Sequence, residues 1–278
     1  MKKMIKKILT FLLCGTIIAS MPLAFSACKE KPDKPKISVT YNNITYRISR
    51  CTYESDPENR YPDEFKVWGD YFYQAGRIDE YDETGEPIIA RHIAAEVNGV
   101  PVLSTDYSLF MNEGAGECAS LVLEKLYIPG TIVNFGSRYL KNTKVSCFYC
   151  GKPNILTYND SAKYKIYVPN QMYSKYIELL PEDVSAEDFL NKANVSYRLN
   201  VQELPKQYQT EYYYVDYVEY GEQIENIPPE PTMKGYKFGG WYTETDCINQ
   251  WNFTNAVPQP AEGEDFNELC LYAKWIKK

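Results

Sequence analysis

Apolar and polar residues alternate in the chain from about Ile37 onward, and this alternation predicts β-strands. Residues 44–48 have the order Ile-Thr-Tyr-Arg-Ile, and a similar alternation runs through residues 71–81. A period of two residues places one set of side chains on a buried face and the other on an exposed face. Residues 83–87 separate two apolar runs and contain Gly85, which adopts a positive φ without strain, so we expect a turn and a hairpin there.

A longer pattern occurs twice in the middle of the chain. Residues 97–110 can be laid over residues 126–140 so that Val102 meets Ile132. Each copy has a short apolar segment, a turn and a further apolar residue. Repeats of this kind are typical of a solenoid, in which each unit buries one face against the next.

Residues 165–169 form a third and shorter copy, and a short helix is predicted after them. Asn170 is placed to cap the start of this helix, and Pro181 is placed to end it. The apolar face of the helix would consist of Tyr173, Tyr176, Ile177 and Leu180.

These segments resemble the BspA-like leucine-rich repeats. The matching pieces are Ile128-Pro129, Phe135-Gly136, the Val-Asn-Gly-Val-Pro-Val string at 97–102 and the closing Tyr-Val-Pro at 167–169. The resemblance covers about residues 90 to 180, and it implies a very short, capped solenoid of strands with irregular returns. An ordinary small β-rich domain is the alternative.

The C-terminal region contains an ordered series of aromatic residues and glycines. Gly235 and Gly239 permit tight turns, and the prolines at 228 and 231 favour an extended connection. A module this small needs large rings to build a core. The rings placed to do so are Tyr236, Phe238, Trp241, Tyr242 and Trp275.

The series closely resembles the internalin-type B repeat, also called the Listeria-Bacteroides repeat. The residues that carry the likeness are the Pro-Thr at 231–232, the Gly-Tyr-Lys-Phe-Gly-Gly-Trp-Tyr at 235–242 and the Leu-Tyr-Ala-Lys-Trp at 271–275. The resemblance implies a small β-grasp-like module that serves as a spacer or interaction unit and has no catalytic residues. We therefore expect a mainly β protein with minor α, in which a short BspA-like solenoid within residues 37–193 precedes a β-grasp-like module at 194–278.

The first residues have the properties of an export signal. Four lysines precede an apolar run from Ile8 to Ala19, which is too short to span a bilayer. The segment Phe25-Ser26-Ala27-Cys28 resembles a bacterial lipobox, with phenylalanine where leucine is usual. This resemblance implies a signal peptide at 1–27, a lipid on Cys28 and a location on the extracellular face of the bacterial cell membrane. Ordinary secretion with cleavage near Ala27 and an uncleaved anchor are the alternatives.

Residues 28–36 are charged and rich in proline, so we expect a flexible tether. Removing residues 1–27 takes away four of the 30 basic residues and none of the 37 acidic ones, which leaves a charge of about −11. Such a charge argues against nucleic acid as a partner and against a chain that lies flat on an anionic membrane. The expected partners are a protein or a glycan outside the cell.

Histidine and cysteine provide few routes to catalysis. His92 is the only histidine, and we expect it just before a strand, at the surface or at a sheet edge. Cys147 and Cys150 have the spacing of a redox or zinc motif without its context, so buried thiols or a local disulfide are expected. Pairing stays open for the six cysteines outside the export segment, which are Cys51, Cys118, Cys147, Cys150, Cys247 and Cys270.

Acidic residues cluster at 56–64 and 79–86, but they lack the order of a calcium-binding EF-hand loop, so a solvated acidic face is expected. A facing pair of carboxylates, as in glycosidases, cannot be identified among so many acids. We find no phosphate-binding loop and no nucleophile elbow. The sequence thus predicts no enzyme, no cofactor and no metal site.

Tyrosine is the one positive chemical feature, with 26 residues. The tyrosines at 212–214, 217 and 220 alternate around Val215 and Val218, so a strand would place part of this set on its outer face. Rigid rings there can anchor a protein or stack on a sugar, or they can cover the neighbouring loop. The candidate partner-binding residues are Tyr212, Tyr214, Tyr217 and Tyr220. The leading hypothesis is a surface lipoprotein that acts as a binding or adhesion module. The alternatives are a lipoprotein that captures carbohydrate or nutrients with exposed aromatics, and a hydrolase with an unrecognised carboxylate pair.

Overall fold

The computed structural model of the chain describes residues 38–50, 71–78, 81–105, 123–133, 135, 144–153, 165–180 and 185–278. Residues 35–278 form one compact unit. The predicted signal peptide, the tether and Cys28 lie outside the described residues, as do Cys51, Cys118 and the acidic cluster at 56–64. The described residues are mainly β and contain one short α-helix.

The first of three sheets is built from the N-terminal strands. Its order is β1 (Ser38–Tyr41), β2 (Ile44–Arg50), β3 (Tyr71–Ile78), β6 (Val100–Thr105) and β5 (Glu96–Val97). The predicted alternation at 44–48 is confirmed, because Ile44 and Tyr46 are buried and Arg47 is exposed. The predicted turn is also confirmed, since Gly85 has a φ of 87° and a bridge pairs Tyr81 with Pro87.

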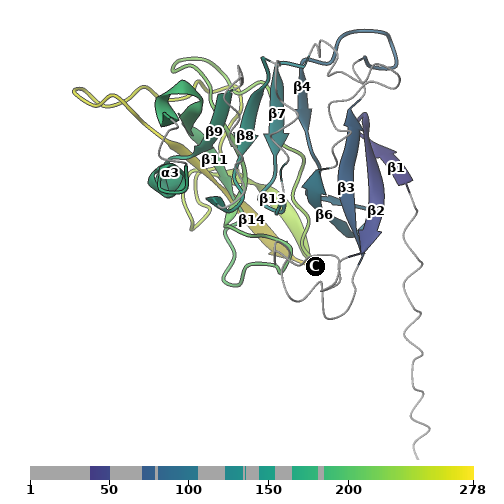
Figure 1. The fold of residues 1–278 in the computed structure, drawn as a ribbon. Helices are drawn as coiled ribbons and strands as arrows, with labels where there is room; N and C mark the ends of the chain where they lie inside the picture. The colour runs from purple at the N-terminus through teal and green to yellow at the C-terminus, as the bar shows by residue number, and fades with distance from the viewer. Residues whose placement is uncertain are drawn as a thin grey trace, which may run out of the picture. The chain divides into compact units, whose positions relative to one another are not determined.

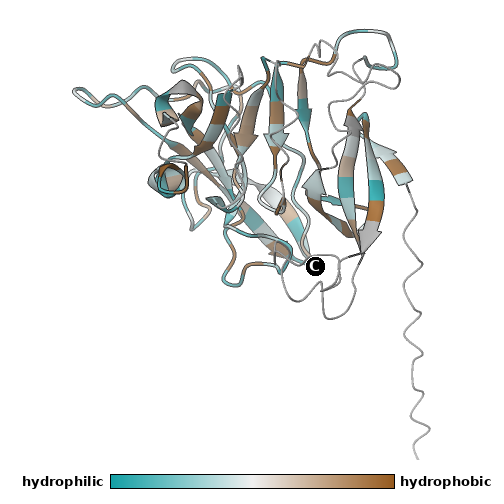
Figure 2. Ribbon diagram, in the orientation of Figure 1, coloured by the Kyte–Doolittle hydropathy of each residue, from teal (hydrophilic) through white to brown (hydrophobic). Residues whose placement is uncertain are grey.

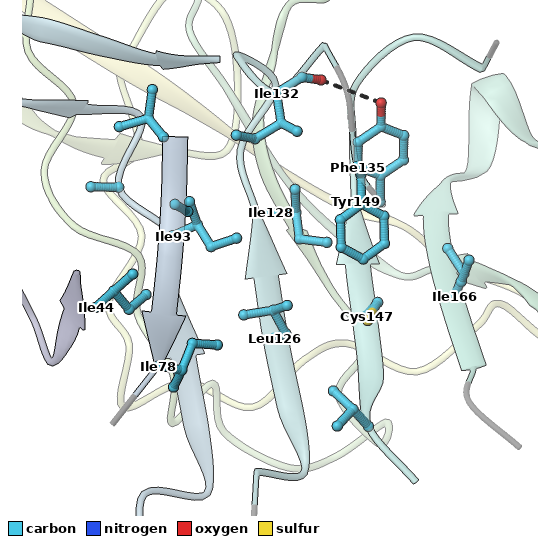
Figure 3. Close-up of a cluster of buried hydrophobic side chains, with 14 of the residues drawn as sticks. Ile44, Ile78, Ile93, Leu126, Ile128, Ile132, Phe135, Cys147, Tyr149 and Ile166 are labelled. Atoms are coloured by element: carbon cyan, nitrogen blue, oxygen red, sulfur yellow. Dashed lines mark hydrogen bonds between the residues drawn. The ribbon is translucent and has the colours of Figure 1, made fainter. Parts of the chain in front are cut away.

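The second sheet adds one parallel strand at a time along the chain (Figure 1). Its strands, in order across the sheet, are β4 (Ala90–His92), β7 (Lys125–Ile128), β8 (Ser146–Tyr149), β9 (Lys165–Pro169) and β10 (Leu190–Ala193). Leu126, Cys147 and Ile166 are paired in register and form a row across neighbouring strands (Figure 3). Such rows let each strand bury its aliphatic side chains against the next one.

The predicted overlay of the two repeat copies is right at one end and wrong at the other. Leu103 does lie beside Val133, whose backbone N–H donates a hydrogen bond to the Leu103 carbonyl at 2.7 Å. The strand that pairs with β7, however, is β4 and not the segment that begins at Val97. The cause is an inserted hairpin: Asn98 and Gly99 have positive φ values of 52° and 76°, so β5 turns back on β6.

The helix after β9 is present, but its details differ from the prediction. Residues 170–172 form a 3-10 turn, α3 spans Tyr173–Ile177, and a second 3-10 turn spans Ala186–Asp188. Asn170 makes no side-chain capping hydrogen bond. Of the predicted apolar face, Tyr176 is buried, whereas Ile177 is 40% exposed. No helix in the described residues has the length and apolar character needed to cross a membrane.

The third sheet contains the C-terminal strands β11 (Val195–Arg198), β12 (Tyr212–Asp216), β13 (Tyr236–Tyr242) and β14 (Leu269–Lys277). Their order is β12-β11-β14-β13, and only the central pair β11–β14 is parallel. A bulge after Phe238, where Gly240 has a φ of 108°, turns both Phe238 and Trp241 into the core. The predicted aromatic core is therefore confirmed for Trp241 and Tyr242, while Tyr236 is 38% exposed.

The parallel sheet has a hydrophobic core on each face, and its strands are among the most hydrophobic parts of the ribbon in Figure 2. One core includes Leu126, Cys147 and Ile166 together with residues of the first sheet. The other core includes Tyr127 and Phe148 together with residues of the third sheet, because β12 packs across β7, β8 and β9. Residues on both sides of position 194 thus share one core.

Gly130 marks the closest approach between the two regions. Its N–H donates to the Tyr213 carbonyl at 3.2 Å, and its own carbonyl accepts from the Gln209 N–H at 3.0 Å. A Cβ at this position would lie 2.2 Å from the Tyr212 carbonyl oxygen. Only glycine lets the two backbones pair this closely.

Candidate functional site

Four ring side chains form a stack across the parallel sheet, which we call the aromatic ladder. His92, Tyr127, Phe148 and Tyr167 occupy paired positions on β4, β7, β8 and β9. Successive ring centroids are 4.2, 4.6 and 4.9 Å apart, and the planes are inclined by 10°, 15° and 15°. Adjacent strands lie about 4.8 Å apart, so flat rings that are in register meet face to face. The strand pairing itself therefore creates the ladder.

Tyr217 adds a fifth ring from the C-terminal region. Its centroid lies 5.3 Å from that of Tyr167, with an inclination of 30°. This contact brings the segment after β12 close to the ladder. A ring supplied by residue 217 thus extends a stack that begins at residue 92.

Asp216, the last residue of β12, lies buried beside the ladder with only 1% of its surface exposed. Its Oδ1 accepts a hydrogen bond from the Tyr127 hydroxyl at 3.0 Å and one from the Tyr217 N–H at 2.8 Å. Burial raises the pKa of this carboxyl to about 6, although the positive charge of Lys125 lowers it. Within the part of the chain that the structure describes, Oδ2 has no hydrogen-bond partner and no basic side chain lies within 4.0 Å of the carboxylate.

A cleft of about 350 Å³ opens at this point, and we call it the Asp216 cleft. One wall comes from the starts of β7 and β8 and from the rings of Phe148 and Tyr167, and the other comes from residues 216–226. Four lining residues are acidic and one is basic. The charged and amide residues of the lining are Lys125, Asp216, Glu219, Glu222, Gln223, Glu225 and Asn226. A cleft lined by both aromatic rings and acidic side chains can hold a ligand that has an apolar part and a positive or hydrogen-bond-donating part.

The four candidate tyrosines separate into two pairs. Tyr217 and Tyr220 are partly exposed, and Tyr217 lines the Asp216 cleft. The Tyr220 hydroxyl donates to the Asn267 carbonyl at 2.9 Å and accepts from the Asn267 N–H at the same distance. Partner binding by these two rings remains a prediction.

The expected outward position is wrong for Tyr212 and Tyr214, which are 3% and 0% exposed. They alternate with Tyr213 as predicted, but their face of β12 packs on the parallel sheet. The Tyr214 hydroxyl donates to the Ile93 carbonyl, and the Tyr212 hydroxyl lies 3.3 Å from the Gln171 side-chain oxygen. These two rings thus bind a protein surface that belongs to the same chain.

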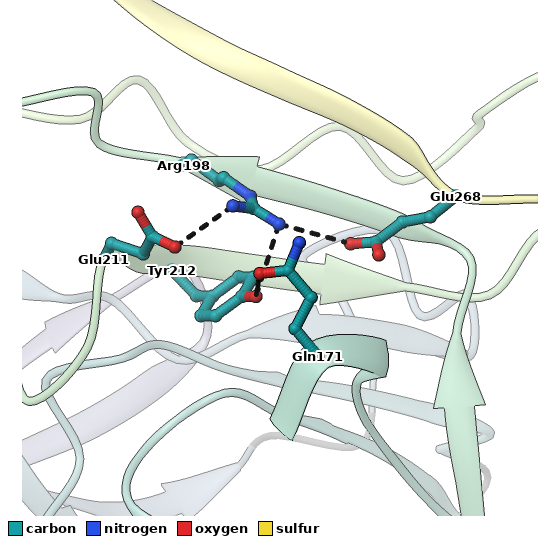
Figure 4. Close-up of polar contacts among 5 residues, drawn as sticks. All are labelled: Gln171, Arg198, Glu211, Tyr212 and Glu268. Atoms are coloured by element: carbon teal, nitrogen blue, oxygen red, sulfur yellow. Dashed lines mark hydrogen bonds and ion pairs between the residues drawn. The ribbon is translucent and has the colours of Figure 1, made fainter. Parts of the chain in front are cut away.

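Tyr212 is part of a charged network around Arg198 (Figure 4). The Arg198 guanidinium lies 4.8 Å from the centre of the Tyr212 ring, forms an ion pair with Glu211 at 3.0 Å and lies 3.8 Å from Glu268. This cation joins β11 to the start of β12 and to the residue before β14. Its partners come from its own sheet, so we assign it to the stability of the repeat region.

His92 ends β4, an edge strand of the parallel sheet, and does not precede a strand as predicted. The edge position is confirmed, but the side chain is partly buried between rings: it stacks on Tyr127 and meets the Tyr214 ring edge at 5.2 Å. Its Nε2 is buried without a hydrogen-bond partner among the described residues. Burial, together with the positive charge of Arg91, lowers the pKa of His92 to about 3, so the imidazole is neutral near pH 7.

Cys147 and Cys150 are both fully buried free thiols. They lie three residues apart near the end of one strand, so Cys147 belongs to the core shared with the first sheet and Cys150 to the core shared with the third sheet. Burial raises the pKa of both thiols, which removes the thiolate that redox or zinc chemistry needs. The buried-thiol prediction is confirmed, and Cys247 and Cys270 are free as well.

Acidic side chains of the described residues do not gather into a metal site. Asp82, within the second predicted acidic cluster, uses its Oδ1 to accept hydrogen bonds from the N–H groups of Thr84 and Glu86. A hydrogen bond from the Thr84 hydroxyl at 2.7 Å, together with these backbone bonds, lowers the pKa of Asp82, and the three bonds stabilise the turn around Gly85. Glu83 and Glu86 are exposed, as expected for a solvated face.

Sequence reasoning missed Asp216, Lys125 and Tyr167 as parts of one site. Asp216 was one of 37 acidic residues and had no motif around it. The available signal was the likeness of Leu126-Tyr127-Ile128-Pro129 to Ile166-Tyr167-Val168-Pro169, which places Tyr127 and Tyr167 at equivalent positions of two strands. Only the packing of β12 on those strands brings Asp216 beneath them.

One family model matches part of the chain, and a search of curated proteins found no match. The model covers residues 194–274, which include all four strands of the third sheet and Asp216 on the wall of the cleft. Repeats of this family occur in surface-associated proteins of the adhesion type. Residues 194–274 of this chain form a Listeria-Bacteroides repeat domain.

Proposed function

We propose that this chain is a binding protein on the outer face of a bacterial cell, held there by a lipid on Cys28, and that it performs no catalytic turnover. The basic and apolar N-terminal residues and the lipobox-like segment at 25–28 support export and lipidation. The Listeria-Bacteroides repeat domain supports a role in surface attachment. The partner would be a protein outside the cell.

The fold supports the same proposal at a finer level. We interpret the five parallel strands added in chain order as a short BspA-like solenoid, because that is how solenoid units stack. We interpret the third sheet as β-grasp-like, since its first and last strands are parallel neighbours at the centre and the other two flank them. Neither fold requires a catalytic site.

The observation that carries the proposal is the Asp216 cleft at the junction of the two regions. The Tyr127 hydroxyl, Gly130 and Tyr214 all hydrogen-bond across this junction, so the two walls of the cleft are held in fixed positions. A rigid cleft loses little conformational entropy when a partner binds. The junction thus provides what an adhesion module needs: a recognition site that is already formed.

A carbohydrate-binding protein is the second candidate function. The rings of Tyr167 and Tyr217, together with the amides of Gln223 and Asn226, line the cleft, and a sugar could use both kinds of group. The acidic character of the wall favours a protein partner, because a basic side chain of a protein can pair with that charge and a neutral saccharide cannot.

Binding is tested by probing immobilised extracellular proteins and glycans with the full chain and two tyrosine variants. Tyr217→Ala removes a ring from the cleft, and we expect affinity for the protein partner to fall about tenfold, as for a central aromatic contact. Tyr236→Ala removes a ring that is exposed outside the cleft and should have no effect. Binding to glycans alone, or equal effects of the two variants, would contradict the proposal.

The anchor is tested separately by metabolic labelling with a radioactive fatty acid. Label should be present on the native chain and absent from Cys28→Ala. Label that persists in Cys28→Ala would remove the lipid anchor from the proposal. Turnover of a small metabolite that one cleft substitution abolishes without unfolding the chain would remove the claim that the protein is not an enzyme.

A further inference from the structure

The Asp216 carboxylate is buried, and none of the described basic side chains forms an ion pair with it. Burying an ionised carboxylate is costly unless it is paired, and Asp216 is satisfied by hydrogen bonds on Oδ1 alone. Lys125 lines the same cleft, but its Nζ lies 5.9 Å from the centre of the Phe148 ring and forms no ion pair among the described residues. A buried acid that lines a cleft, and that has hydrogen bonds on one oxygen but no ion pair among the described residues, is suited to pair with a charge supplied from outside.

We infer that the Asp216 cleft receives one basic side chain, lysine or arginine, from an extended segment of a partner protein, and that Asp216 is its counter-charge. This inference rests on the proposed binding function and names the chemistry that the cleft recognises. The rings of Phe148 and Tyr167 contact the apolar stem of the entering side chain. The carboxylates of residues 216–226 surround its charged end.

The charge of the lining favours a cation over a neutral ligand. Lys125 is the one basic residue of the lining, against four acidic residues on the opposite wall. Three of these, Glu219, Glu222 and Glu225, are exposed and attract a cation from solution, and Asp216 holds it at the buried end. A neutral sugar would add hydrogen bonds but would add no positive charge to that of Lys125.

The size of the cleft fits one side chain and not a whole folded element. Its volume of about 350 Å³ is near the lower end of the range for ligand pockets, which is roughly 300–1,000 Å³. A single anchoring side chain with weak contacts around it is a common arrangement at protein interfaces.

Binding should depend on pH, because the entering cation favours the ionised form of Asp216. The groups that face this carboxyl are Lys125 and Tyr127 from β7, Tyr167 from β9, Tyr197 from β11, and Tyr217 and Glu219 after β12. The pKa values of the four tyrosines are raised, so these hydroxyls stay neutral between pH 5 and 7.5. Affinity should therefore fall as Asp216 becomes protonated below about pH 6.

The test uses isotope-labelled full chain and capped pentapeptides with the sequence Gly-Gly-X-Gly-Gly. We expect the lysine and arginine peptides to shift the amide resonances of residues 216–226 with millimolar affinity at pH 7.5, and to bind several-fold more weakly at pH 5. The acetyl-lysine and citrulline peptides have nearly the same shape without the charge and should not bind. Maltotriose serves as a neutral saccharide probe.

Variants then test which carboxylate pairs with the bound basic side chain. Asp216→Asn keeps an acceptor for Tyr127 and Tyr217, and it should weaken the lysine peptide about tenfold, as expected for a buried charge pair. If this variant does not fold, the double variant Glu222→Gln and Glu225→Gln changes exposed residues only and should weaken binding two- to threefold. Glu203→Gln, an exposed acid outside the cleft, is the matched control and should bind as the native chain does.

Equal binding of charged and uncharged peptides, displacement of the lysine peptide by maltotriose at similar concentration, or unchanged affinity in Asp216→Asn would overturn the inference. The result is separable from the proposed function. Peptide binding without any extracellular partner would contradict only the adhesion role. Partner binding that Tyr217→Ala weakens and excess lysine peptide does not inhibit would contradict only the basic ligand.

Discussion

The parallel sheet and the Listeria-Bacteroides repeat domain reach stability by different routes. In the parallel sheet, each strand repeats the same positions, so rows such as Leu126, Cys147 and Ile166 and the aromatic ladder arise from register alone. In the repeat domain, single features carry the packing, such as the bulge at Gly240 that brings Trp241 into the core. The repeated positions of the parallel sheet form a broad hydrophobic face, and the Listeria-Bacteroides repeat domain packs on it. The Asp216 cleft lies beside the aromatic ladder and is lined by residues of both regions.

The largest expected effect tests whether the two regions unfold together. Trp241 is 4% exposed and packs against Tyr197, Tyr213 and Phe238, so Trp241→Ala should lower the free energy of unfolding by about 4 kcal/mol. Because the core is shared, we expect hydrogen exchange to become faster in β8 as well as in β14. Unchanged protection of β8 would show that the regions are independent domains.

Gly130 lies where the two regions pair by backbone hydrogen bonds, so replacing it tests this contact directly. Gly130→Ala places a Cβ 2.2 Å from the Tyr212 carbonyl oxygen, and we expect a loss of about 3 kcal/mol in urea unfolding. Gly85→Ala is the control: its Cβ has open space, and its positive φ costs about 1 kcal/mol. If the two variants lose the same amount, the close approach at Gly130 contributes nothing of its own.

The alternation of apolar and polar residues predicted strand positions well. It failed for features that are set by tertiary contacts. The strand at 44–48 and the core position of Trp241 follow from local alternation and glycine placement, which need no knowledge of the rest of the fold. Asn170 failed as a cap because a 3-10 turn precedes α3, and this is decided by how the chain leaves β9.

The tyrosines of β12 show the same limit at the candidate site. Tyr212 and Tyr214 alternate as an amphipathic strand would, but β12 is buried on both faces. The Tyr214 hydroxyl donates a hydrogen bond to the Ile93 carbonyl, and the Tyr212 hydroxyl donates one to the Gln171 side chain. Both acceptors belong to the other region. Polar atoms on every second residue of a strand predict an exposed face only if no second layer of the protein covers that face. For the same reason, Asp216 could not be distinguished from other acids.

A smaller effect is expected from removing one hydroxyl at the junction. Tyr127→Phe keeps the ring in the ladder but takes away the donor to Asp216, which should cost about 2 kcal/mol, as for a hydrogen bond to a charged group. The pKa of Asp216 should rise further, since the ionised form loses a donor. The measurement combines urea unfolding with carboxyl titration by NMR. Tyr81→Phe, an exposed ring, should change neither quantity.

The smallest expected effect is a change in the free energy of unfolding with pH, and its sign differs between the two regions. Burial raises the pKa of Asp216 to about 6 and lowers that of His92 to about 3. The folded state therefore binds a proton at Asp216 more tightly than the unfolded chain does, so this group adds stability as the pH falls from about 7 toward 4. His92 has the opposite sign, because the unfolded chain takes up its proton first, and stability is lost below about pH 6.5.

The two contributions overlap in pH, and Asp216→Asn separates them. His92 is present in both proteins, so the difference between their unfolding free energies isolates the carboxyl. Between pH 7 and pH 5 the native chain should gain about 1 kcal/mol relative to Asp216→Asn, measured by urea unfolding at each pH. A difference that stays constant over this range would mean that Asp216 titrates as an ordinary exposed acid. The buried end of the cleft would then be open to water, and the aromatic ladder would not shield the site that we assign to a basic side chain.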